Sequence, residues 1–533
     1  MILPALLLQV AAAAAPLDPP VTRDRPLHDV LHYDIMVSVD DTGRHLLGQV
    51  EALVRLRSRE PVVLDLDRRY RVVRSFTDGR RGPYARDEDV VAIPHEKPPG
   101  DSITVRVRWH GDAEDGLVIG TNAAGVRTVF GDNYPDRARR WLAVQDHPSD
   151  KATVTWHVEV PPGQQAIANG VLERVDTLPY GRTVWHYRQA QPIPTYTMVV
   201  GVTRFARTEV PPSACDVKCV PQAVWTYPAD SAKALQGPFR RIDDIVGFLS
   251  RLIGPFPYDR LTHVESSTRY GGMENATAIF YSDRAIAAGR LGEATTAHEV
   301  AHQWFGDAVT PDEFTHVWVS EGFATYLAAL WVGHAEGDSA FRATMARAAE
   351  TVRRSKATER PIVDTLPSGD LVQILSSNPY QKAGWMLHSL RRLVGDTAFF
   401  GAIRRYATER QHGTARTADV QRVVEQAYGQ PLEWFFRQML AQPGYPQLDV
   451  TPTYDARRKA LQLRIVQRQP EAWGTWRLPN LAVRVAGETR RVAVEGRETV
   501  VTLERVPAPP AALAIDPDGD WLLDATVAPL ARR

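Results

Sequence analysis

The chain of 533 residues has little cysteine, no excess of either charge and no long apolar run. Lys+Arg and Asp+Glu both total 63, so a basic surface for nucleic acid or an anionic membrane is not expected. The longest apolar run, at the N-terminus, is shorter than the ~20 residues that cross a bilayer, so no integral membrane span is expected. Repeats and glycine-rich phosphate loops are also absent from the sequence. The composition is therefore typical of a globular protein without nucleotide-binding signatures.

The two cysteines, Cys215 and Cys219, lie in "ACDVKC". A structural zinc site is not expected here because no second Cys/His pair lies nearby. In an oxidising compartment the pair can close a small loop, and in a reducing one it would remain two free thiols. The sequence leaves both alternatives open.

The N-terminus, "MILPALLLQVAAAAAPLDPP", combines an apolar run with small residues, as in a secretory signal. It lacks the basic segment that usually precedes the apolar run, so a misassigned start or an Ala-rich tail is the alternative. We expect a signal peptide over residues 1–15 and export to the periplasm or the medium.

The hydrophobic pattern changes twice along the chain, which is too long for one core. Residues 16–207 alternate apolar and polar positions, as in "KATVTWHVEVP", and predict an N-terminal antiparallel β-sandwich. Residues 208–442 show three- and four-residue spacing, with several segments ending on glycine, and predict a mostly helical domain. Alternation returns over residues 443–533 and predicts a small C-terminal β domain. The expected fold class is multidomain α+β.

The segment "EATTAHEVAHQWFGD" places His298 and His302 four residues apart, with Glu299 between them. On an α-helix this step turns ~400° and rises ~6 Å, so both imidazoles leave one face and can share a Zn²⁺. Glu299 lies ~100° around the helix, beside the metal, where it can accept a proton from water. Two unrelated surface histidines are the alternative, but the apolar residues around them predict a buried helix whose polar groups need partners.

A zinc ion held by two histidines needs a third protein ligand and an open position. Glu321 follows His302 by nineteen positions, in "HVWVSEGFATYLAALWVG". Ser320 is the expected N-cap, which places Glu321 in the first turn of a second helix that can bring its carboxylate to the metal. Alone, Glu321 could equally be a carboxylate favoured by the helix dipole.

Together, "HEVAHQWFG", "VWVSEGFATY", "GGMEN" and "NPYQKAGWML" resemble the aminopeptidase N family of zinc peptidases, peptidase family M1. The resemblance extends over the three-domain order and implies a thermolysin-like catalytic domain. Because the sequence ends about ninety residues after the helical region, it resembles a short form without the C-terminal helical domain of many relatives.

The resemblance implies one Zn²⁺ per chain, bound by His298, His302 and Glu321. It also implies Glu299 as general base, Tyr380 as oxyanion donor, Glu274 as the group that binds the free amino terminus, and Gly271, Gly272 and Met273 as backbone lining the peptide. The implied substrates are peptides with a free N-terminus. A fixed anion one residue from the scissile bond is also what an exopeptidase needs physically, to count from the chain end.

Two positions depart from the family pattern. Asp132, in "FGDNYPDRARRW", stands where the family carries a glutamine that helps to hold the substrate amine, and we expect Asp132 to assist there. Asp307 replaces the usual asparagine after the HExxH helix, without a consequence that the sequence reveals. The alternative functions are a zinc endopeptidase and a non-catalytic binding protein on a peptidase fold; an epoxide hydrolase is less favoured.

Overall fold

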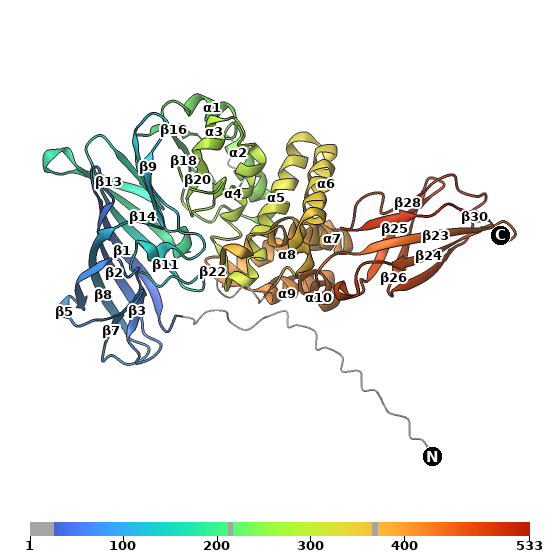
Figure 1. Cartoon of the computed structure of the whole chain (residues 1–533), viewed down its shortest axis with the longest axis horizontal. Helices are drawn as coiled ribbons and strands as arrows, with labels where there is room; N and C mark the ends of the chain where they lie inside the picture. The colour runs from blue at the N-terminus through green and yellow to red at the C-terminus, as the bar shows by residue number, and fades with distance from the viewer. Residues whose placement is uncertain (1–25, 212–216, 365–370, 533) are drawn as a thin grey trace, which may run out of the picture.

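The structure is a computed structural model that describes residues 26–211, 217–364 and 371–532. The expected signal peptide, residues 1–15, and Cys215 lie outside the described residues. Figure 1 shows three regions in a row, with sheets at the N-terminal end, helices in the middle and sheets at the C-terminal end. This arrangement confirms the expected α+β fold class.

The N-terminal region is built around an eight-stranded sheet in the order β13-β14-β11-β1-β2-β8-β4-β5. Its strands are β1 (Asp29–Val39), β2 (His45–Arg55), β4 (Arg71–Thr77), β5 (Arg80–Gly82), β8 (Ser102–Asp112), β11 (Lys151–Val160), β13 (Val171–Thr177) and β14 (Thr183–Pro194). The sheet is not wholly antiparallel as expected, because β1 and β11 run parallel. Every second residue of β11 is buried, so the alternation in its sequence reflects one face packed on the core.

Two smaller sheets accompany the large one. A four-stranded sheet has the order β12-β15-β10-β9, and a three-stranded sheet has the order β3-β7-β6. Their strands are β3 (Val62–Asp65), β6 (Ala85–Asp87), β7 (Val90–Ile93), β9 (Leu117–Thr121), β10 (Arg127–Gly131), β12 (Gln165–Ala168) and β15 (Val200–Thr203).

The central region begins with a five-stranded sheet in the order β16-β17-β18-β20-β19. Its strands are β16 (Ala206–Val210), β17 (Gln222–Thr226), β18 (Leu261–Ser266), β19 (Gly272–Met273) and β20 (Ala278–Ser282). Strands β17, β18 and β20 run parallel, and nearly all of their residues are buried. The short strand β19 pairs antiparallel with β20 at the edge, which places the "GGMEN" segment on the rim of the sheet.

Helices form the rest of the central region, with the first four beside this sheet and the others between it and the C-terminal sheets (Figure 1). They are α1 (Ser231–Gln236), α2 (Ile242–Ile253), α3 (Asp283–Ala287), α4 (Glu293–His302), α5 (Trp318–Glu336), α6 (Asp338–Arg354), α7 (Ala383–Val394), α8 (Asp396–Arg410), α9 (Thr417–Tyr428) and α10 (Glu433–Ala441), with the short strands β21 (Val309–Pro311) and β22 (Gly413–Ala415). None of the described helices combines the length and apolar character needed to cross a membrane.

Not every glycine that closes a helical segment in the sequence marks the end of a helix in the structure. Two of the helical segments that finish on glycine in the sequence do end there, α2 at Gly254 and α7 at Gly395, both with positive φ. Helix α5, however, runs through Gly333 and ends before Gly337. A Cβ on Gly333 would lie 3.0 Å from the Cβ of Phe341, so this glycine serves the close approach of α6 rather than a helix end.

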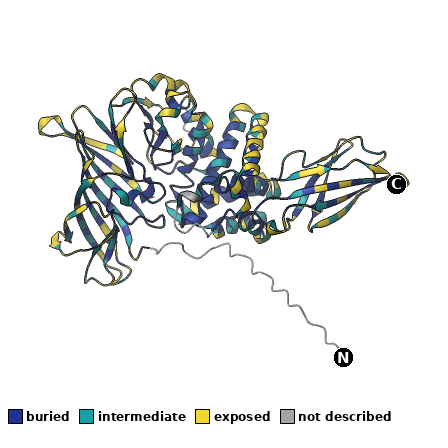
Figure 2. Ribbon diagram, viewed as in Figure 1, coloured by how far each residue is buried: buried dark blue, intermediate teal, exposed yellow. Residues whose placement is uncertain are grey.

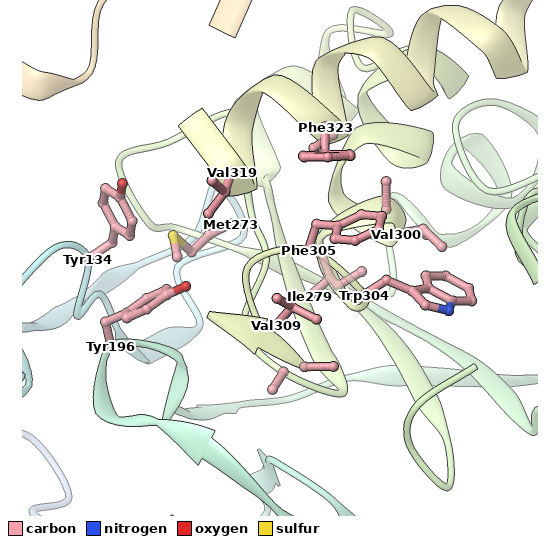
Figure 3. Close-up of a cluster of buried hydrophobic side chains, with 14 of the residues drawn as sticks. Tyr134, Tyr196, Met273, Ile279, Val300, Trp304, Phe305, Val309, Val319 and Phe323 are labelled. Carbon is pink, nitrogen blue, oxygen red and sulfur yellow. The ribbon is translucent and has the colours of Figure 1, made fainter. Parts of the chain in front are cut away.

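A continuous apolar core lies beneath α4 and α5 (Figure 3). The rings of Phe305 and Phe323 stack with centroids 4.5 Å apart and join the end of α4 to α5. On the other side of the cluster, Tyr134 and Tyr196 of the N-terminal region meet edge to face at 5.5 Å. The core therefore extends from one region into the next, and the exposed residues of Figure 2 gather on the outer surfaces.

Polar contacts also join the N-terminal and central regions. The Lys151 ammonium, at the start of β11, donates to the backbone carbonyls of Asp307 (2.8 Å), Ala308 (2.8 Å) and Gly413 (3.2 Å). The Tyr196 hydroxyl donates to the carbonyl of Gly306 at 3.0 Å. These bonds tie the loop after α4 to the N-terminal strands.

The C-terminal region contains two packed sheets, β27-β24-β23-β29 with β30 beside β23, and β26-β25-β28. Its strands are β23 (Gln447–Asp455), β24 (Ala460–Gln467), β25 (Leu478–Val485), β26 (Glu488–Val494), β27 (Glu498–Leu503), β28 (Leu513–Ile515), β29 (Asp524–Val527) and β30 (Ala531–Arg532). The buried carboxylate of Asp520 binds Arg392 of α7 at 2.5 Å and Arg491 of β26 at 2.6 Å, which anchors this region to the helices.

Candidate active site

Helices α4 and α5 pack side by side and bring three potential metal ligands together. The Nε2 atoms of His298 and His302 lie 3.0 Å apart, and each lies 3.2 Å from Oε2 of Glu321. His302 and Glu321 are buried, and His298 is partly exposed toward the cavity. Three acceptor atoms converging this closely need a shared cation or protons between them.

The protonation of His302 is set by its other nitrogen. His302 Nδ1 lies 3.0 Å from the carbonyl oxygen of Phe305 and 2.9 Å from Oγ of Ser320. A carbonyl can only accept, so Nδ1 carries the proton and Nε2 presents its lone pair to the other two ligands. The expectation that Ser320 caps α5 was wrong: the helix begins at Trp318, and the Ser320 hydroxyl bonds to the Phe305 carbonyl and the His302 ring instead.

Glu299 lies beside the ligand triangle, the three converging side chains of His298, His302 and Glu321, rather than within it. Its side chain is buried on α4 and lines the same cavity as the three ligands. Burial raises the pKa of the Glu299 carboxyl well above its ordinary value. A carboxyl with a raised pKa holds a proton more readily, which suits a group that must accept and return one.

Tyr380 reaches the triangle from the other side. It belongs to a single π-helical turn, Asn378–Lys382, directly before α7, and its hydroxyl donates to Oε1 of Glu321 at 2.8 Å. Its ring lies parallel to that of His298, with centroids 6.1 Å apart. The π turn is wider than an α-helical turn, and Tyr380 within it lines the cavity.

Glu274 follows the edge strand β19, and its backbone is held by the helix that carries the histidines. Gln303 donates to the carbonyl of Glu274 at 3.1 Å and accepts from the N–H of Thr277 at 2.9 Å. Gln303 also donates to Oδ2 of Asp307 at 2.7 Å. Asp307, whose role the sequence did not reveal, thus orients the glutamine that fixes the "GGMEN" turn.

The three candidate ligands line one cavity of about 200 Å³ together with Glu299, Tyr380 and Glu274. All of the residues expected at the site line it except Asp132: Gly271, Gly272, Met273, Glu274, His298, Glu299, His302, Glu321 and Tyr380. Sequence reasoning missed three further lining residues, Tyr134, Tyr270 and Leu375. Tyr270 directly precedes the "GGMEN" motif, which was the one signal that could have identified it.

The expectation for Asp132 was wrong because its side chain lies outside the cavity and pairs with two arginines. Oδ1 accepts from Nη2 of Arg137 at 2.8 Å, and Oδ2 accepts from Nε of Arg269 at 2.8 Å. The side chain is buried and does not line the cavity. A buried carboxylate requires such partners, and both oxygens of Asp132 already have an arginine partner away from the cavity.

Comparison with known families agrees with this geometry. The model of the peptidase family M1 domain matches residues 245–439, and that of the peptidase M1 N-terminal domain matches residues 30–197. Together the two matches cover more than half of the chain; the first contains His298, His302 and Glu321, and the second contains nearly all of the eight-stranded sheet. The chain belongs to peptidase family M1.

Individual relatives are similar at modest identity. The tricorn protease-interacting factor F2 of Thermoplasma volcanium is 27% identical over 369 residues, which cover 64% of this chain and 44% of the relative. The glutamyl aminopeptidase of Rattus norvegicus is 25% identical over 370 residues, covering 65% and 38%. The chain thus spans less than half the length of these two relatives.

A solved structure is similar over most of its length. It is a mutant of the M1 zinc metallopeptidase from Deinococcus radiodurans bound to a Tyr-Ser-Ala substrate. It superposes with a TM-score of 0.68 at 28% identity and covers 78% of this chain and 94% of that one.

Proposed function

We propose that the protein is a zinc aminopeptidase that hydrolyses the first peptide bond of peptides with a free N-terminus. The observation that carries the proposal is the meeting of His298, His302 and Glu321 in one cavity with the buried Glu274. The names of the relatives support it, since they include a glutamyl aminopeptidase and a zinc metallopeptidase bound to a tripeptide.

The three ligands fit a zinc ion. With Zn–N and Zn–O bonds of ~2.0–2.1 Å and tetrahedral angles, ligand atoms should stand ~3.3 Å apart, and here they stand 3.0–3.2 Å apart. The donor set of two neutral imidazoles and one carboxylate, with an open side toward the cavity, is that of catalytic zinc. When bound, zinc would supply Lewis acidity that polarises the scissile carbonyl and acidifies water.

The protein's own residues would then transfer the proton and stabilise the developing negative charge. Glu299 takes the proton of the attacking water and returns it to the leaving amine. The Tyr380 hydroxyl, which lines the cavity, donates to the oxygen that becomes negative as the carbonyl is attacked. In this structure the hydroxyl donates its one proton to Glu321, so it would turn from that carboxylate to the developing oxyanion.

Glu274 would define the exopeptidase specificity. Its buried carboxylate lies at the cavity wall, held by Gln303 through the backbone, and can accept charge-assisted hydrogen bonds from a substrate α-ammonium. A blocked N-terminus would lose these bonds and leave a buried carboxylate unpaired.

We also propose that the protein is exported from the cytoplasm. Cys219 is disulfide-bonded, as expected in an oxidising compartment, and this supports a periplasmic or secreted location. The N-terminus of the mature protein, sequenced by mass spectrometry after fractionation of the native cells, tests it. A chain that retains Met1 in the cytoplasmic fraction would contradict export.

The activity is tested by purifying the full chain with zinc and assaying aminoacyl-arylamides with and without an N-acetyl group. We expect about one zinc per chain, hydrolysis of free substrates only, and loss of that discrimination in Glu274→Ala. Equal hydrolysis of acetylated and free peptides would identify an endopeptidase instead. Failure to bind zinc would point to a binding protein on this fold.

A further inference from the structure

Two carboxylates and two arginines form a closed cluster beside the candidate active site. Asp132 accepts from Arg137 and Arg269, as described above. Asp115 accepts at one oxygen, Oδ1, from Nη1 of Arg137 at 3.4 Å and from Nη2 of Arg269 at 3.3 Å. Asp115, Asp132 and Arg137 belong to the N-terminal region, and Arg269 belongs to the segment that leads into β19.

The residues on either side of this cluster form two walls of the cavity. Arg269 is followed directly by Tyr270, Gly271, Gly272 and Met273, all of which line the cavity. Asp132 stands two residues before Tyr134, which also lines it. The Tyr134 and Tyr270 rings meet edge to face, with centroids 6.3 Å apart and an interplanar angle of 88°. The ion pairs therefore hold together Tyr134 and Tyr270, two aromatic residues of the cavity wall that come from different regions of the chain.

The cluster is asymmetric in its exposure. The Asp132 side chain is 0% exposed and that of Arg137 is 9% exposed, whereas Arg269 is 49% exposed. Loss of Arg269 would leave Asp132 paired with Arg137 in the N-terminal core, so the fold of that region would be kept. What would be lost is the link to the segment that carries Tyr270.

We propose that the Asp132–Arg269 ion pair positions Tyr134 and Tyr270 as an aromatic wall that selects substrates with a large apolar or aromatic N-terminal side chain. The inference rests on the proposed function. It gives Asp132 a role as a positioning residue, acting through its arginine and the tyrosines, in place of the direct contact with the substrate amine expected from the sequence. Met273 and Leu375 complete the apolar lining.

The test compares phenylalanyl- and alanyl-arylamides on the zinc-loaded full chain. For Arg269→Gln we expect KM for the phenylalanyl substrate to rise about fivefold or more, with kcat near that of the wild type and little change for the alanyl substrate. Arg269→Lys should raise KM for the phenylalanyl substrate less than Arg269→Gln does, because lysine keeps the positive charge but lacks the planar guanidinium donors. In a double-mutant cycle, Asp132→Asn should add little to Arg269→Gln. The matched control is Arg464→Gln, which breaks an exposed ion pair with Glu498 in the C-terminal region.

An unchanged ratio of kcat/KM between the two substrates, or additive effects in the cycle, would overturn the proposal. A second measurement does not require activity: hydrogen exchange of the amides of residues 270–273 should be faster in Arg269→Gln than in the wild type or Arg464→Gln. Unchanged exchange would refute the positioning role. If the wild-type protein cleaves neither substrate but exchange does accelerate, the proposed function fails while the positioning role stands.

Discussion

Gly272 packs directly against Glu299. A Cβ built on Gly272 would lie 2.6 Å from Cγ of Glu299 and closer still to its carboxylate, a distance that real Cβ atoms do not tolerate. The edge strand β19 and the histidine-bearing helix α4 therefore meet at a point where only glycine fits, and this contact sets where the Glu299 carboxylate lies.

The first prediction follows from that contact. Gly272→Ala should displace Glu299 and lower kcat/KM by about tenfold or more, since a misplacement near 1 Å can cost ~100-fold. Arylamide kinetics and a thermal melt measure activity and folding separately. Gly401→Ala on α8, where nothing lies within 4 Å of the added Cβ, is the control and should behave like the wild type. Full activity of Gly272→Ala would show that the carboxylate position is not critical.

The second prediction concerns Glu299, the proposed proton acceptor. Glu299→Gln keeps the shape of the side chain but removes its basicity, so kcat should fall by about 10²–10⁴-fold. Zinc content, measured by atomic emission, should stay at the wild-type value because Glu299 lies outside the ligand triangle. Glu350→Gln, on the exposed side of α6, serves as the control. Loss of zinc together with activity would instead make Glu299 a ligand.

The third prediction concerns the hydrogen bonds behind His302. Ser320→Ala removes one of the two groups that contact Nδ1, so zinc affinity should fall about 10- to 100-fold. Competition with a chromophoric chelator measures the affinity. Ser389→Ala is a matched control, since Ser389 is a buried serine of α7 whose hydroxyl has no hydrogen-bond partner among the described residues. Equal affinities for both variants would argue against the orienting role of Ser320.

The fourth prediction is a pH dependence of stability. His388 of α7 is buried where the C-terminal region docks, with Nε2 lying 3.0 Å from the carbonyl of Gly519 and Nδ1 lying 3.1 Å from the Tyr326 hydroxyl. Burial lowers the pKa of His388 to about 4. Between pH ~6.5 and about 4 the unfolded chain binds a proton that the folded chain does not, so acidification through this window should destabilise the fold.

The expected loss is up to about 3 kcal/mol, from about 1.4 kcal/mol per unit of pKa. Melting temperatures measured from pH 7 to pH 4 should fall less steeply for His388→Gln than for the wild type. His45→Gln, at a histidine whose side chain is 44% exposed, should follow the wild-type curve. Parallel curves for His388→Gln and the wild type would show that His388 does not control this acid sensitivity.

The sequence predicted what depends on local spacing. The four-residue step from His298 to His302, the glutamate between them and the first-turn position of Glu321 follow from helix geometry and from a motif whose residues are close together. The alternation of β11 likewise reports one buried face.

Contacts between distant segments were not predictable in this way. Asp132 is expected at the substrate from its place in the family pattern, and nothing in "FGDNYPDRARRW" shows that Arg269, far along the chain, pairs with one of its oxygens. Ser320 was assigned to a helix cap because its contact with Phe305 exists only once α4 and α5 are packed. Tyr134 was missed for the same reason, since it enters the cavity from another region.

The ammonium of Lys151 has a consequence for how this protein can be divided. A residue of the N-terminal sheet completes the hydrogen bonding of three carbonyls in the loop after α4 and in β22, and burial lowers its pKa to about 7. If the chain were cut between the two matched family segments, the catalytic half would expose those carbonyls and the loop that follows its histidines. The two halves therefore stabilise each other, and a catalytic half produced alone should be less stable than the same half within the full chain.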